Sequence, residues 1–158
     1  MREWRSYPLA LAMVGVLTAC GGDSEEGEPL LGGEVSGDFA GKSFTAENGF
    51  ATIYEDTPLI VIGDGPVHCG TESKNSPPSG TNAAMTVPAF EVGNYTSQFV
   101  QLYDNDGDFR GVGSNTGSIS LTAVTAESIA GSVEFDYTSD EQEHFSVSGS
   151  FEVLLCSP

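Results

Sequence analysis

Basic residues are scarce in this chain. Only five of its 158 residues are Lys or Arg, against 23 Asp and Glu, and the formal net charge is −18. Such a surface repels phosphate backbones and anionic lipid headgroups, so we expect binding neither to nucleic acid nor, by charge, to a membrane surface. The charge favours cationic partners and says nothing about the fold.

Apolar runs are also short. The longest, residues 9–17, falls below the roughly 20 residues that a membrane-spanning helix needs. It follows Arg2 and Arg5 and leads to small residues and a cysteine, which is the layout of a secretory signal peptide. We therefore expect an exported protein with no spanning helix.

The tetrad Leu17-Thr18-Ala19-Cys20 resembles the lipobox of bacterial lipoproteins. The resemblance implies that Cys20 is acylated, that residues 1–19 are removed, and that the new amino terminus is acylated too. Several acyl chains anchor firmly, whereas one binds marginally. In this family an Asp directly after the cysteine retains the protein in the inner membrane, so Gly21 implies the outer membrane where the source has one. The alternative is an ordinary signal peptide that leaves Cys20 free.

The mature chain then carries three basic and 22 acidic residues, a net charge of 3 − 22 = −19. Residues 20–33 are rich in Gly and Glu and predict a flexible acidic tether that carries the lipid. The remaining residues, 34–158, are enough for a single domain with its own core. We expect a lipid-anchored protein of the bacterial cell envelope, attached to the membrane through Cys20 alone.

Cysteine is rare as well, with three in the chain. If Cys20 carries lipid, Cys69 and Cys156 remain, and disulfides persist in exported domains. We predict a Cys69–Cys156 disulfide. The chain-entropy account gives a loop of this length roughly 4–5 kcal/mol of stabilisation.

Helical periodicity is absent from residue 34 onward, where apolar and polar residues alternate between Gly, Asn, Pro and Asp turns. This predicts an all-β domain: an antiparallel β-sandwich of about eight short strands, with a small lipocalin-like β-barrel as the alternative. Gly131 and Gly149 lie on apolar faces and predict a bend, a bulge or a close approach of another layer. The predicted strands are 42–46, 49–55, 59–62, 83–87, 95–103, 117–123, 128–137 and 144–155.

Two of these segments carry a second resemblance. Gly117-x-Ile119-x-Leu121, followed by Ile129-x-Gly131-x-Val133-x-Phe135, is similar to a signature of small secreted bacterial lipoproteins of unknown function. This sequence pattern is structural, so it supports the β-fold and implies no catalytic residue.

Recognisable catalytic motifs are lacking. The chain has no Gly-x-Ser-x-Gly elbow and no spare thiol once the cysteines are used. Its one tryptophan, Trp4, leaves with the signal peptide, which makes sugar stacking unpromising. A carboxylate pair for glycoside hydrolysis stays open.

The run Asp104-Asn105-Asp106-Gly107-Asp108 is the one candidate metal site. Alternate carboxylates on a tight loop suit calcium, and the run resembles the start of a calcium-binding loop. Asn115 stands where such a loop places its bidentate Glu, so the site of Asp104, Asp106 and Asp108 predicts only weak calcium binding. The alternative is a hairpin turn that forms without metal. We expect no metal at the isolated His68 and His144.

These observations favour a lipid-anchored, non-catalytic binding or structural module of the cell envelope, with a protein or small-molecule partner that the sequence does not name. A small-molecule carrier of lipocalin type is the alternative, which needs a closed barrel with an apolar cavity. An envelope hydrolase is the third possibility, which needs clustered acids with perturbed pKa values in a cleft.

Overall fold

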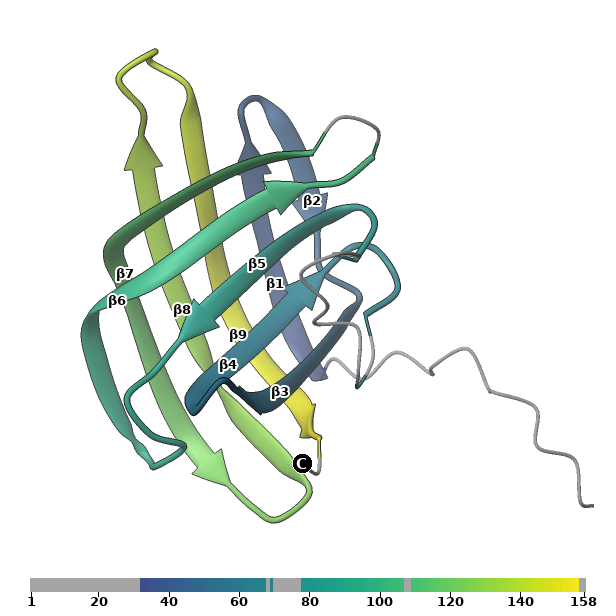
Figure 1. Cartoon of the computed structure of the whole chain (residues 1–158), viewed down its shortest axis with the longest axis vertical. Helices are drawn as coiled ribbons and strands as arrows, with labels where there is room; N and C mark the ends of the chain where they lie inside the picture. The colour runs from purple at the N-terminus through teal and green to yellow at the C-terminus, as the bar shows by residue number, and fades with distance from the viewer. Residues whose placement is uncertain (1–31, 68, 70–77, 107–108, 157–158) are drawn as a thin grey trace, which may run out of the picture.

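The computed structural model describes residues 32–67, 69, 78–106 and 109–156, and their regular structure is entirely β-strand (Figure 1). The strands in this part of the chain are β1 (Gly32–Phe39), β2 (Lys42–Thr45), β3 (Asn48–Tyr54), β4 (Thr57–Gly63), β5 (Thr81–Thr86), β6 (Gly93–Asp104), β7 (Arg110–Val124), β8 (Ser128–Thr138) and β9 (His144–Leu155).

The strands form one continuous sheet in the order β2-β1-β9-β3-β4-β5-β6-β7-β8, and β9 also pairs with β8. Strands β3 to β9 therefore close into a seven-stranded barrel, and β1 and β2 are two extra strands. The barrel is mixed: β9 runs parallel to β3 at a short junction and antiparallel to β8 and β1.

The predicted β-sandwich is wrong. Strand β9 pairs with β8 from His144 to Leu154, while its other edge pairs with β1 from Phe145 to Glu152 and with β3 at Leu154 and Leu155. With both edges used, the sheet returns on itself and does not stack against a second sheet. The predicted alternative, a small barrel, is closer, although a lipocalin has eight up-and-down strands and this ring has seven with one parallel junction.

The predicted strands are largely confirmed. The segment 144–155 matches β9 to the residue, and 128–137 is β8 one residue short. The segment 117–123 is the second half of the longer β7. Strand β1 was not predicted, and it begins at Gly32, inside the range assigned to the tether.

Alternation places the apolar side chains of each strand inside the barrel. The interior cluster includes Phe135 from β8 and Phe151 from β9, at 2 % exposure each, opposite fully buried aliphatic side chains of β4 to β6. Each such side chain contributes about 1.5–3 kcal/mol on burial. The other members include Val35, Phe39, Phe44, Ile60, Ile62, Met85, Val100, Leu102, Ile119, Leu121, Ile129, Val133, Phe145, Val147 and Val153.

Gly131 and Gly149 both allow a close approach, although of a neighbouring strand in the same sheet and not of another layer. A Cβ at Gly131 would overlap the carbonyl oxygen of Ser120 on β7, and one at Gly149 would overlap that of Glu34 on β1. Gly149 also has φ of +139°, a conformation that side-chain-bearing residues rarely adopt. These glycines let β7, β8, β9 and β1 lie side by side.

A second apolar cluster lies on the outer face of β3 and β4. Phe50 and Val61 are buried there with Val67 and Cys156, although they point away from the barrel interior. Strand β4 is therefore apolar on both faces, because residues that follow it in the sequence, including Val67, cover its outer face. The predicted Cys69–Cys156 disulfide is present and joins this chain to the residue after β9.

The turns divide between two ends of the barrel (Figure 1). The β1–β2, β6–β7 and β8–β9 connections lie at the top of Figure 1, and we call this the upper end. The β5–β6 and β7–β8 turns lie at the opposite, lower end. Gly32, where β1 begins, pairs with Glu152 near the end of β9, whereas Phe39, where β1 finishes, pairs with Phe145. Strand β1 therefore runs from the lower to the upper end.

Candidate functional site

The predicted calcium-site residues lie at the upper end, where β6 ends. Asp104 is the last residue of β6 and pairs with Thr81 on β5 and Arg110 on β7. Asp106 follows in the connection to β7. Asp108 lies outside the described residues. Asp104 and Asp106 therefore lie at the same connection between β6 and β7.

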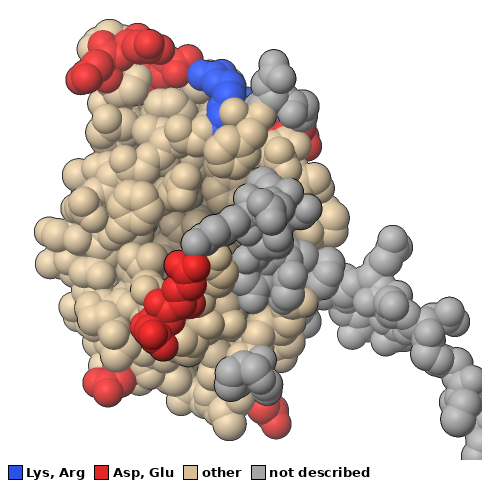
Figure 2. Space-filling model, viewed as in Figure 1, with Lys and Arg blue, Asp and Glu red and all other residues tan. Residues whose placement is uncertain are grey.

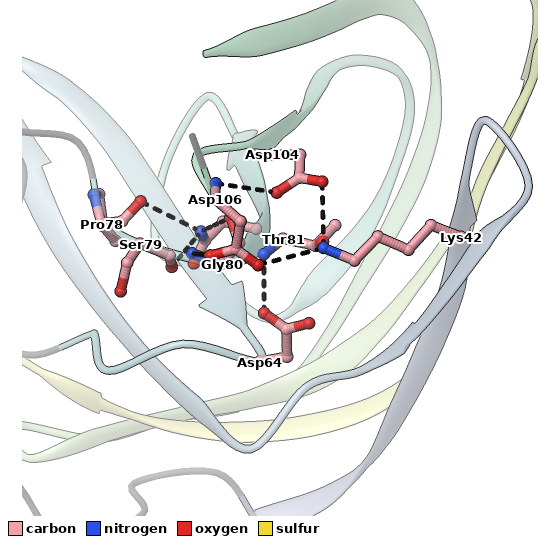
Figure 3. Close-up of polar contacts among 9 residues, drawn as sticks. Lys42, Asp64, Pro78, Ser79, Gly80, Thr81, Asp104 and Asp106 are labelled. Carbon is pink, nitrogen blue, oxygen red and sulfur yellow. Dashed lines mark hydrogen bonds and ion pairs between the residues drawn. The ribbon is translucent and has the colours of Figure 1, made fainter. Parts of the chain in front are cut away.

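Lys42 from β2 binds both of these carboxylates (Figure 3). Its Nζ lies 3.1 Å from Asp104 Oδ2 and 3.2 Å from Asp106 Oδ2. The hydrogen bonds to Asp104 and then to Asp106 raise the pKa of Lys42 above its ordinary value. The ammonium is half exposed and Asp104 is largely shielded, so the pair contributes about 0–1 kcal/mol to stability.

The same carboxylates hold the chain that returns to β5. Asp106 Oδ1 accepts a hydrogen bond from Gly80 N at 3.0 Å, and Asp104 Oδ1 accepts one from Asp106 N at 3.2 Å. Asp64, just after β4, accepts from Thr81 N at 2.7 Å. Three segments far apart in the sequence thus meet around these side chains (Figure 3).

Asn82, on β5, makes further hydrogen bonds at the place where these segments meet. It is fully buried, and its Nδ2 donates to the carbonyl oxygens of Ser79 and Gly80, each at 3.0 Å. Its amide needs Gly63 on the adjacent strand, since a Cβ there would overlap Asn82 Oδ1. The sequence carried one signal for this role, which we missed: a polar amide directly before the small apolar residues Ala83 and Ala84.

The contacts around Asp104 and Asp106 are structural, because they hold neighbouring segments of the chain together. Both carboxylates already have an ammonium and backbone N–H groups as partners. Within the described part of the chain, no group of three or more His, Cys, Asp or Glu side chains is placed to hold a metal ion. Weak calcium binding at Asp104, Asp106 and Asp108 stays a prediction, because Asp108 is not described.

A second ion pair crosses the same end. Arg110, the first residue of β7, donates from Nη2 to both carboxylate oxygens of Glu143, at 3.1 and 3.2 Å. Its guanidinium carbon lies 5.8 Å from the centre of the Phe39 ring. Both pairs join hairpins that are remote in sequence, so they tie the upper end of the barrel together.

The other predicted residues are placed as follows. His144 Nε2 lies 3.0 Å from Asp136 Oδ2 on the exposed outer face of β8 and β9, and His68 lies outside the described residues. Cys20 and the tether also lie outside them. Among the residues that the structure describes, no helix is long and apolar enough to cross a membrane.

Tyr103 was missed by the sequence analysis. It lies on β6, packs against Phe109 with ring centres 5.8 Å apart, and is 7 % exposed. Burial raises the pKa of its hydroxyl to about 12. Alternation did not predict this burial, because Tyr103 follows the inward-facing Leu102 and so lies on the outer face of the strand.

Comparisons with protein-family models, with curated proteins and with solved structures found no match to this chain.

Proposed function

We propose that this protein is a non-catalytic binding module of the bacterial cell envelope, anchored by lipid on Cys20. Support for the anchor comes from the lipobox-like residues 17–20, the basic residues before them and the polar segment after them. Gly21 favours the outer membrane where the source has one.

The path of β1 distinguishes the two ends of the barrel. A tether from Cys20 enters the barrel at Gly32, at the lower end. Strand β1 then runs eight residues, about 27 Å, to the upper end. The upper end is therefore the end away from Gly32, where the proposed tether joins the sheet.

One observation at that remote end carries the binding proposal. Of the three basic residues in the mature chain, the structure describes Lys42 and Arg110, and both lie there among carboxylates. Figure 2 shows blue side chains beside red ones at this end. A pocket of about 300 Å³ adjoins Arg110. Ligand pockets commonly carry a few polar or charged groups on their walls, as this one does.

The barrel interior favours binding at this surface over carriage inside. A carrier of lipocalin type encloses its ligand, and about eight strands give an interior just wide enough for side chains to fill it. The seven-stranded ring is occupied by Phe, Met, Leu, Ile and Val side chains that are at most 6 % exposed. This packing supports a ligand that binds between the loops.

The anchor is tested by membrane fractionation of the native host that expresses Cys20→Ser. We expect the variant to leave the membrane fraction, because no other attachment is proposed. Ser24→Ala, a change in the same segment, is the matched control and should stay membrane-bound. Retention of Cys20→Ser in the membrane at the level of this control would contradict the proposal.

A further inference from the structure

The outer face of the sheet carries no charged side chain where β4, β5 and the upper halves of β6 and β7 lie side by side. Backbone pairing sets Val61, Ala84, Gln101 and Gly113 in one row across these four strands. The outward residues in the rows on either side are uncharged as well. Figure 2 shows largely tan side chains over β4 to β6, which lie at the front of that view. This uncharged face belongs to a chain with a net charge of −18.

Two phenylalanine rings are exposed on this face. Phe99 of β6 is 39 % exposed and lies over Gly113 of β7, where a Cβ would come within 2.7 Å of the ring. Phe109, just before β7, is 54 % exposed and packs on Tyr103, with 5.8 Å between ring centres and 32° between ring planes. Each exposed ring therefore rests on the protein on one side and meets solvent on the other.

Gln101 lies between these rings on β6. Its side chain is partly exposed and makes no hydrogen bond within the part of the chain that the structure describes. Phe99 and Tyr103 are four residues apart on the strand, so the two aromatic positions are about 14 Å apart with the amide between them. Gly111 and Gly113 of β7 have no side chain, so Gln101 and Phe99 lie across them and the surface stays flat.

We propose that this surface binds a linear, uncharged polysaccharide. A sugar ring has an apolar C–H face that packs on an aromatic ring, and hydroxyl groups at its rim that form hydrogen bonds with an amide. Two aromatic positions with an amide between them, in a row about 14 Å long, fit an extended chain of sugars better than a single sugar. The uncharged face suits a neutral ligand, whereas the net charge of −18 repels anionic polymers.

Sugar stacking was unpromising from the sequence, because Trp4 is the one tryptophan and lies in the expected signal peptide. The two phenylalanine rings supply the flat surface instead. This surface is separate from the pocket beside Arg110, which is lined by neither Phe99 nor Phe109. The inference therefore goes beyond the proposed function, and it does not depend on the lipid anchor.

The test is an NMR titration of the exported chain carrying Cys20→Ser, with the neutral hexasaccharides cellohexaose, chitohexaose and maltohexaose as probes. We expect saturable shifts at Phe99, Gln101 and Phe109 with at least one probe. That probe should bind about tenfold more tightly than its own monosaccharide, which reaches only one ring. Added salt should leave the affinity unchanged, because no charges pair. No saturable shift with any probe up to about 10 mM, or equal affinities for hexasaccharide and monosaccharide, would overturn the proposal.

Ring variants locate the effect. Phe99→Ala and Phe109→Ala should each weaken hexasaccharide binding about fivefold, because each removes one ring. Ile53→Ala with Val92→Ala is the matched control, since these side chains are 51 % and 66 % exposed and lie away from this face. Equal weakening by the control would contradict the assignment of the ligand to this surface.

A second copy of the chain is the competing occupant, and sedimentation of the same variants tests it. We expect no change of oligomeric state in Phe99→Ala with Phe109→Ala. A dimer that this double variant dissociates, without binding of any probe, would assign the face to self-association and overturn the proposal. Failure here, with Cys20→Ser still lost from the membrane, would remove the polysaccharide and leave the anchor standing.

Discussion

The carboxylates of Asp104 and Asp106 share the ammonium of Lys42, so a cation already occupies the predicted calcium site. A calcium ion would have to displace this ammonium and would find few remaining ligands. Both effects point to the weak end of calcium sites, about 0.1–1 mM or weaker. The structure thus supplies a second reason for weak binding, besides the missing bidentate Glu.

We predict that Lys42→Met strengthens calcium binding severalfold, because the competing ammonium is gone, while stability changes by at most about 1 kcal/mol. Calorimetric titration with calcium measures the affinity. Lys74→Met, which removes the same charge elsewhere in the sequence, is the control. Micromolar binding by the natural chain that disappears in the triple Asp→Asn variant at Asp104, Asp106 and Asp108 would contradict this account.

Tyr103 gives a pH dependence at the same scale. Its pKa is about 12 in the folded protein and about 10 in the unfolded chain, because burial disfavours the phenolate. The stability from its neutral hydroxyl is complete below pH 10 and is lost as the pH rises toward 12. By pH 11 the loss should be about 1 kcal/mol.

Urea unfolding at pH 8 and pH 11 measures this loss, with Tyr103→Phe as the comparison. Phenylalanine keeps the ring contact with Phe109 and cannot ionise. We expect the free energy of unfolding to fall by about 1 kcal/mol more in the natural protein than in the variant. An equal fall in both proteins would show that Tyr103 is not the group responsible.

At the scale of the element, β1 depends on a single glycine of its neighbour. Gly149→Ala should cost more than about 2 kcal/mol, since it combines an unfavourable φ of +139° with overlap against Glu34. Gly41→Ala is the matched control: its φ is +88°, but a Cβ there meets nothing within 4 Å. We expect it to cost about 1 kcal/mol.

Urea unfolding gives both costs, and hydrogen exchange locates them. In Gly149→Ala the β1 amides paired with β9 should lose protection before those of β8 and β9. Equal costs for the two variants, or uniform loss of protection, would contradict the role assigned to Gly149.

The strands themselves were predictable and their closure was not. Alternation is local, so it gave β9 to the residue and most of β8. Alternation is the same in a sandwich and in a barrel, since a sheet in either fold has one buried and one solvent-exposed face. Closure depends on two residue pairs between β3 and β9, Phe50 with Leu154 and Ala51 with Leu155, about a hundred residues apart in the sequence. Strand β1 was missed because Gly32, Gly33 and Gly37 dilute its alternation.

The candidate site was likewise predictable from the sequence only in part. The spacing of Asp104 and Asp106 indicated carboxylates on one loop. Their partner Lys42 is 62 residues from Asp104, and only the barrel brings them together. The pocket beside Arg110 is likewise lined by Phe39, Tyr137 and Phe145, which come from three different strands.

At the scale of the whole molecule, two apolar clusters have different supports. The interior cluster is enclosed by the barrel, whereas the outer cluster of Phe50, Val61 and Val67 lies beside the Cys69–Cys156 disulfide. The disulfide spans 87 residues, which in the chain-entropy account stabilises the fold by roughly 4–5 kcal/mol.

We predict that the double variant Cys69→Ser with Cys156→Ser loses several kcal/mol of unfolding free energy and keeps its β-sheet content, because the interior cluster does not contain either cysteine. Urea unfolding and circular dichroism measure the two quantities. Non-reducing peptide mapping of the natural protein should recover the linked pair. Two free thiols in protein taken from its own envelope would contradict the bridge.

Our central proposal is that lipid on Cys20 holds this barrel at a membrane. Mass spectrometry of the natural protein, purified from the membranes of its host, tests this claim most directly. The account predicts a mature chain that begins at Cys20, lacks residues 1–19 and carries acyl mass on the N-terminal peptide. A mature N-terminal peptide with an unmodified Cys20, or an intact segment 1–19, would contradict it.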